Sequence, residues 1–122
     1  MNPVEIKGLP ANLEAERLVL GSVILEGTRY PQVAETLGRD DFSLDKHRRI
    51  WDAMGRMYES GVEIDRVTLA NVLMERRELE AAGGLGYLVS LDDGLPHIVN
   101  LESYIRIVKD KAALRRIIVS AQ

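Results

Sequence analysis

Apolar residues recur along most of this chain with the spacing of helices, and the first clear case is residues 13–25. Asn12 stands directly before that segment, where its side chain can accept a backbone N–H bond, and Glu14 and Glu16 complement the positive end of the helix. Apolar residues fall on nearly every side of this helix, which is typical of a helix with neighbours all round. Gly21 lies in its middle and predicts close approach by another element.

Two further helices are predicted between residues 31 and 61. Pro31 suits the first position of a short helix, and Ser43 is the expected cap of a longer one that Ser60-Gly61 closes. We expect one face of the longer helix to be buried, with His47 hydrogen-bonded to a neighbour and Trp51 in the core. The residues of this face are His47, Ile50, Trp51, Met54, Met57 and Tyr58.

Shorter elements follow. Residues 62–65 are predicted to form an extended link, after which Asp65 and Thr68 begin a helix that runs to about Arg76. Its inward-facing residues are expected to be Leu69, Ala70, Val72 and Leu73.

The next segment predicts one more helical turn at residues 79–82, terminated by Gly83-Gly84. Residues 87–91 are short enough for a strand or a helix, and we expect a helix because no partner strand is evident. The elements together predict an all-α fold, a compact bundle of about six or seven helices.

The last predicted helix begins after Asn100 and carries two apolar stripes on roughly opposite faces. The stripe that suits docking on the rest of the domain comprises Leu101, Tyr104, Ile105, Val108 and Ala112. The second comprises Ile107, Leu114, Ile117, Ile118 and Ala121. One core cannot bury both, so either another part of this chain covers the second stripe or it meets another protein chain or a missing helix. These residues are our candidates for a protein interface.

The pattern divides the chain into a loose tail (residues 1–8), a helical head (residues 9–99) and the start of a long helix (residues 100–122). No glycine, asparagine or proline terminates that helix. We therefore expect that the sequence was cut inside a longer protein.

Composition narrows the possible roles. The 122 residues carry a net charge of −3 and no cysteine, which excludes disulfide and thiolate chemistry. No apolar run approaches the roughly 18 residues of a membrane-spanning helix, and we expect a cytoplasmic protein without membrane contact. The acidic balance argues against direct nucleic-acid binding. A small helical nucleic-acid-binding module is the alternative, because residues 65–91 have a helix-turn-helix-like pattern.

No catalytic, cofactor-binding or metal-binding arrangement is predicted. The sequence has no G-x-x-x-x-G-K-S/T phosphate loop, and Gly83-Gly84 have a structural interpretation. His97 has no histidine or cysteine companion at the spacing of metal ligands. The basic residues beside His47 and the pair Arg115-Arg116 are expected to lie on solvated faces.

Particular segments nevertheless point to a family. The first are Leu9-Pro10-Ala11-Asn12-Leu13-Glu14-Ala15-Glu16 and Leu20-Gly21-Ser22-Val23-Ile24-Leu25. Others follow in order: Asp41-Phe42, His47-Arg48-Arg49-Ile50, residues 61–65, Val67-Thr68-Leu69, residues 79–84, Tyr87-Leu88, Leu91, residues 100–104 and 114–118. This ordered set resembles the N-terminal domain of bacterial replicative DNA helicases, the DnaB family, over residues 9–122. Residues 95–99 are the stretch least like the family.

The resemblance implies an all-helical head whose last helix enters a helical hairpin, cut here before its second arm. In the family, paired hairpins build a hexameric collar that binds the helicase-binding domain of primase and, in many bacteria, a loader. ATP and Mg²⁺ belong to a separate C-terminal RecA-like domain, so the resemblance implies no cofactor and no catalysis for this segment. The Gly-Gly-x-x-Tyr-Leu pattern adds Tyr87 as an interface candidate, with a core position as the alternative.

Overall fold

The computed structural model describes residues 9–95 and 100–121. Within them every regular element is helical, with six α-helices, two 3-10 helices and no strand, which confirms the predicted all-α fold. The elements are α1 (Leu13–Leu25), η2 (Gly27–Arg29), α2 (Tyr30–Ala34), η3 (Arg39–Asp41), α3 (Asp45–Glu59), α4 (Arg66–Glu75), α5 (Gly84–Asp92) and α6 (Leu101–Ser120). The predicted tail, His97 and most of the link before α6 lie outside the described residues.

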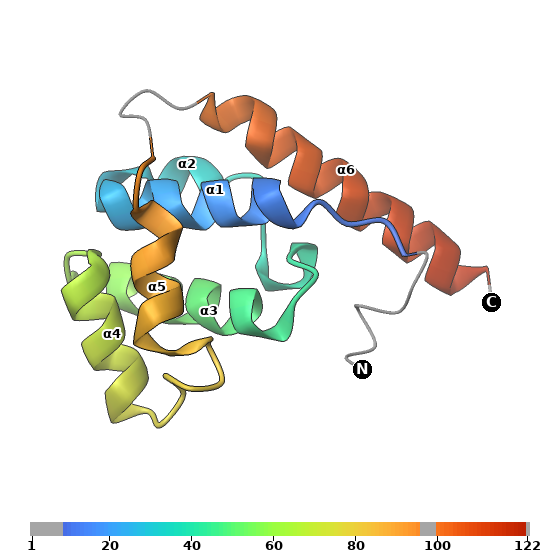
Figure 1. Cartoon of the computed structure of the whole chain (residues 1–122). Helices are drawn as coiled ribbons and strands as arrows, with labels where there is room; N and C mark the ends of the chain where they lie inside the picture. The colour runs from blue at the N-terminus through green and yellow to red at the C-terminus, as the bar shows by residue number, and fades with distance from the viewer. Residues whose placement is uncertain (1–8, 96–99, 122) are drawn as a thin grey trace.

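Helix α1 is the centre of the molecule and contacts α3, α5 and α6 (Figure 1). It begins where the sequence predicts, with the Asn12 side chain accepting the Ala15 N–H at 3.0 Å. Gly21 permits the predicted close approach, because a Cβ there would lie 2.0 Å from the Leu91 carbonyl oxygen of α5. The lack of a side chain at this position therefore sets the distance between α1 and α5.

The core lies between α1, α3, α4 and α5 and continues under the first half of α6. Phe42, which precedes α3, is fully buried beside Trp51, with ring centroids 5.5 Å apart. The predicted apolar face of α3 is buried except at its last position, Tyr58. That side chain is half exposed and packs against the Tyr30 ring. Other fully buried side chains are Val19, Leu20, Val23, Ile50, Met54, Leu69, Leu73 and Leu88.

The predicted cap of α4 is also correct, whereas that of α3 is wrong. Asp65 caps α4 as predicted, since its carboxylate accepts the Val67 and Thr68 N–H groups while Thr68 Oγ1 accepts the Asp65 N–H. Ser43 does not cap α3. The cap position is Leu44, one residue later, and the Ser43 N–H donates to Glu16 of α1.

The glycine pair closes a helical turn, as predicted, and also begins α5. The turn at residues 78–82 has an α-type bond from the Ala82 N–H, and the N–H groups of Gly83 and Gly84 close it on the carbonyls of Glu80 and Leu79. Gly83 and Gly84 have φ of +107° and +83°, a conformation that favours glycine, and α5 begins at Gly84. Residues 87–91 lie within α5, which confirms the predicted helix there.

Helix α6 runs along α1 and continues past the rest of the molecule (Figure 1). Asn100 stands at its cap position, but its side chain makes no cap hydrogen bond with the described residues. No helix among the described residues is long and apolar enough to cross a membrane.

Candidate protein interface

The inner face of α6 is docked as the sequence predicts. Leu101, Ile105, Val108 and Ala112 are buried, and Tyr104 is half buried against the core. These positions follow one another at intervals of three or four residues, so they share one side of the helix. Burial of this face fixes which side of α6 is left for other contacts.

Arg115 extends the inner face by one more turn, which contradicts its predicted place on a solvated face. The side chain is buried, and its guanidinium donates to the Pro10 carbonyl at 2.9 Å and to the Asp41 carbonyl at 2.8 Å. Burial lowers the pKa of Arg115. The spacing from Ala112 was a signal for this position, because three residues further along a helix is the same face.

Asp41 also holds the C-terminal half of α6 against the domain, and sequence reasoning did not identify it. Its buried carboxylate accepts from the Gly38 N–H at 2.7 Å, and it pairs with Arg116 at 2.7 Å and Lys109 at 3.4 Å. Burial raises the pKa of this carboxyl, but these three donors outweigh burial and leave the pKa below its ordinary value. Charged contacts thus hold the C-terminal half of α6 where apolar contacts end.

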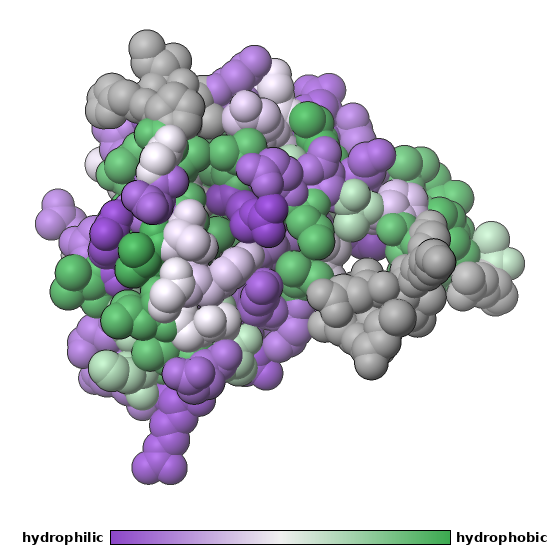
Figure 2. All heavy atoms as spheres, in the orientation of Figure 1, coloured by the Kyte–Doolittle hydropathy of each residue, from purple (hydrophilic) through white to green (hydrophobic). Residues whose placement is uncertain are grey.

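The outer face of α6 is apolar and open in the C-terminal half of the helix. Ile117 is 65% exposed, and Leu114 is also an exposed large hydrophobic residue. Ala121 is exposed as well, Ile118 is half buried, and Ile107 packs partly against the core. Figure 2 shows hydrophobic residues gathered where α6 extends from the body. Val119 is exposed too, but it lies seven residues after Ala112 and so on the side of the inner face, where α6 has passed the rest of the molecule.

Tyr87 lies apart from this face. Its hydroxyl is 2.6 Å from Nε2 of His47, whose Nδ1 lies 2.7 Å from the buried Glu16 carboxylate, and the Lys46 ammonium lies 3.8 Å from the centroid of its ring. Burial raises the pKa of the Tyr87 hydroxyl, although Arg17 acts in the opposite direction. The predicted burial and hydrogen bonding of His47 are confirmed. The described partners of Tyr87 belong to α3 and α1, not to α6.

The basic residues are largely engaged within the fold. Arg48 donates to the Phe42 carbonyl, and Arg49 pairs with Asp45. On the helix-turn-helix-like segment, Arg66 pairs with Asp92 at 3.0 Å, and Arg76 pairs with Glu78 at 3.2 Å. Such internal pairing does not favour the nucleic-acid alternative, which needs cations directed at phosphates. The described residues hold no cluster of three His, Asp or Glu side chains suited to a metal.

Comparison with known proteins gives a consistent result. Residues 8–110 match the family model described as "DnaB-like helicase N terminal domain". The chain is 39% identical over 112 residues to the replicative DNA helicase DnaB of Geobacillus stearothermophilus, a match that covers 92% of this chain and 25% of that protein. The replicative DNA helicase DnaC of Bacillus subtilis (strain 168) is 37% identical with the same coverage. The chain therefore spans about a quarter of the length of these curated relatives.

Two solved structures resemble the fold. The crystal structure of the N-terminal domain of DnaB helicase from Mycobacterium tuberculosis has a TM-score of 0.87 and 35% identity, and the match covers 93% of this chain and 82% of that one. A structure of a DnaB-like replicative helicase and its interactions with primase has a TM-score of 0.80 and 28% identity, covering 91% of this chain and 26% of that one.

Proposed function

The chain belongs to the family of DnaB-like helicase N-terminal domains, and we propose that it is the collar domain of a replicative DNA helicase, which assembles the hexamer and recruits primase. In this proposal the segment carries no catalysis. ATP hydrolysis with Mg²⁺ belongs to a C-terminal RecA-like domain of the parent helicase, which acts in the bacterial cytoplasm. A helicase loader is a further partner under the same proposal.

One observation carries the proposal: one face of α6 is buried against the domain, whereas the opposite face is exposed. The inner face is buried and fastened by Arg115 and Asp41, so the direction of the helix is set. The outer face presents Leu114 and Ile117 to solvent. Contiguous exposed apolar side chains on a fixed helix are typical of a contact with another helix. We propose that this face meets the second hairpin arm and the neighbouring subunit, with Ile107, Ile118 and Ala121 at its margins.

The assembly part is tested by sedimentation equilibrium of the chain and of Ile117→Asp. We expect self-association that Ile117→Asp weakens at least about tenfold, because a carboxylate on the outer face would be desolvated in the contact. Val67→Asp is the matched control, since Val67 is 73% exposed on α4, away from α6. Equal association of all three proteins would remove the outer face from the interface.

The recruitment part is tested by calorimetric titration with the C-terminal helicase-binding domain of primase from the same organism. Saturable binding that Tyr87→Ala or Ile118→Asp weakens would place recruitment in this chain. Binding that neither variant changes would contradict Tyr87 and Ile118 as recruitment residues. No binding to the chain, under conditions where it self-associates, would limit this segment to assembly.

A further inference from the structure

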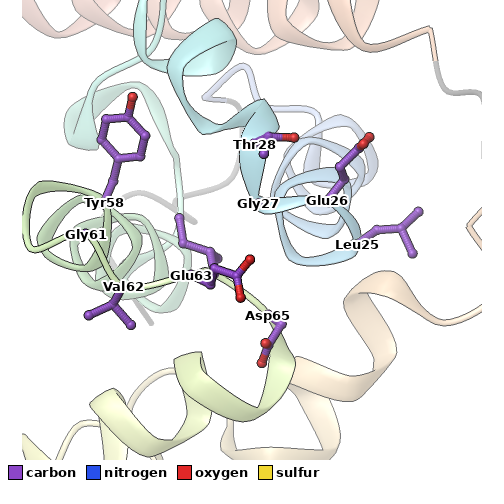
Figure 3. A pocket seen from close by; sticks show the side chains of 10 residues that line it. Leu25, Glu26, Gly27, Thr28, Tyr58, Gly61, Val62, Glu63 and Asp65 are labelled. Carbon is purple, nitrogen blue, oxygen red and sulfur yellow. The ribbon is translucent and has the colours of Figure 1, made fainter.

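A second surface feature lies at the opposite end of the molecule from the exposed part of α6. It is a pocket of about 490 Å³ between the C-terminal end of α1 with η2 and the C-terminal end of α3 with the link to α4. Figure 3 shows Tyr58 on one side, Leu25 on the other and Glu63 between them. The volume is within the range of protein sites for small groups, roughly 300–1,000 Å³.

The backbone around this pocket is fixed without a ligand. Gly27 lies so close to the link that a Cβ there would be 2.6 Å from the Ile64 carbonyl oxygen. The Ile64 side chain is buried, and the Val62 N–H donates to the Met57 carbonyl at 2.8 Å. Asp65 is held by its cap bonds to α4. A partner would therefore meet a preformed surface, which reduces the entropy cost of binding.

The lining combines apolar walls with negative charge. Leu25, Tyr58 and Val62 are all exposed hydrophobic residues. The carboxylates are those of Glu26, Glu63 and Asp65, and the lining includes no lysine, arginine or histidine.

These carboxylates differ in how far they are already neutralised. Glu26 pairs with Arg29 at 2.9 Å. Asp65 accepts backbone N–H groups, and the bond from Thr68 contributes most to lowering its pKa, so it is ionised at neutral pH. Among the described residues, the Glu63 carboxylate has no hydrogen bond or ion pair.

We propose that this pocket binds an arginine side chain, flanked by apolar residues, in an extended segment of a partner protein. A planar guanidinium can bond a carboxylate such as Glu63 through two N–H groups and stack on an aromatic ring such as Tyr58. Apolar neighbours of that arginine would cover Leu25 and Val62. The surface is separate from the outer face of α6, so it gives the domain a second contact, independent of the proposed assembly.

The test is an NMR titration of the ¹⁵N-labelled chain with acetyl-leucyl-arginyl-leucine amide. We expect saturable shifts of amides in residues 25–28 and 58–65. The peptide in which neutral citrulline replaces arginine should bind about three- to tenfold more weakly, as should the native peptide with Glu63→Gln. Glu80→Gln, which removes an exposed carboxylate before α5, is the control and should bind like the unchanged chain.

Three outcomes would overturn the proposal. The first is an absence of shifts at residues 25–28 and 58–65 at millimolar peptide. The second is equal affinity for the citrulline peptide. The third is equal affinity for N-acetylarginine amide alone, which would reduce the pocket to a site for small cations. Ile117→Asp should leave peptide binding unchanged, and Glu63→Gln should leave self-association unchanged, so the two proposals fail separately.

Discussion

Helices α1 and α6 pack against each other, but α1 is enclosed and α6 is half open. Helix α1 contacts α3 and α5 as well as α6, and eight of its residues are buried. Helix α6 is seven residues longer, yet five of its residues are buried, and its main contacts are α1 and η3. A helix enclosed on all sides stabilises the fold, whereas a helix that is buried on one side only can bind a partner with its exposed side. We therefore expect substitutions in α1 to reduce stability and substitutions on the outer face of α6 to reduce association.

Each helix also buries one charged side chain. Glu16 of α1 is held inside the core by the Ser43 N–H and by His47, all of them almost fully buried. Arg115 of α6 donates to two backbone carbonyls at the edge of the domain. Loss of a buried polar partner costs more where water cannot replace it. Loss of the Glu16 partner in the core should therefore cost more stability than loss of the Arg115 bonds at the edge.

The largest effect is expected for Glu16→Ala. The substitution leaves the Ser43 N–H and the His47 ring without their partner in the core, and we expect the free energy of unfolding to fall by about 3–5 kcal/mol. Guanidinium denaturation followed by circular dichroism measures this change. Glu14→Ala, which removes an exposed carboxylate on the same turn, should cost less than about 0.5 kcal/mol. Equal losses would contradict the burial of α1 on the side of Glu16.

Asp41→Asn should have the next largest effect, because Asp41 supports α6 from the edge of the domain. The amide cannot pair with Arg116 and Lys109 as a carboxylate does, and we expect a loss of about 2–3 kcal/mol. Asp40→Asn, the exposed neighbour, should be nearly neutral. A loss as small as that of the control would show that the apolar contacts alone hold α6.

Asp41 also predicts a pH dependence. Since its pKa is lower in the folded chain than in the unfolded one, its stabilisation is present above the unfolded pKa of about 3.9 and is lost as the pH falls toward the lowered folded value. The difference in unfolding free energy between the native chain and Asp41→Asn should therefore be constant from pH 7 to 5 and shrink below about pH 4. A constant difference down to pH 2 would contradict the lowered pKa.

Arg115→Met tests the fastening of α6 more locally. Methionine keeps much of the apolar stem but removes both hydrogen bonds, so we expect a loss of about 1–2 kcal/mol. Hydrogen exchange should accelerate in residues 113–120 and stay unchanged in α1. The control is Arg106→Met, an exposed position on the same helix. Faster exchange throughout the chain would instead indicate that Arg115 supports the whole core.

Local signals in the sequence were enough for most of the helices. The bounds of α1 and the capping box of α4 follow from residues within four positions of each other. Ser43 is not the cap of α3: the helix begins with Leu44 at the cap position, and the Ser43 backbone is held by Glu16, a residue 27 positions away. The pattern of residues in a single sequence shows local preferences for helix caps and turns. It contains no direct signal for a partner so far away along the chain.

The candidate interface divides in the same way. The two stripes of α6 follow from helical spacing, and Arg115 could have been found by the same spacing had charge not been taken as a sign of exposure. The role of Asp41 could not be predicted from local spacing, because its partners Lys109 and Arg116 are 68 and 75 positions away. The pocket at Glu63 likewise depends on how the ends of α1 and α3 meet, which no local motif encodes.

The smallest expected effect compares the starts of the two helices. Asn12 and Asn100 occupy the same cap position, but among the described residues only Asn12 uses its side chain in a cap bond. We expect Asn12→Ala to lower the free energy of unfolding by about 1 kcal/mol and Asn100→Ala by about 0.3 kcal/mol or less. Denaturant titration of both variants measures the two values. Because the substitutions remove the same atoms, equal losses would show that α6 also begins with a cap bond in solution. The contrast between the two helices would then rest on their faces alone.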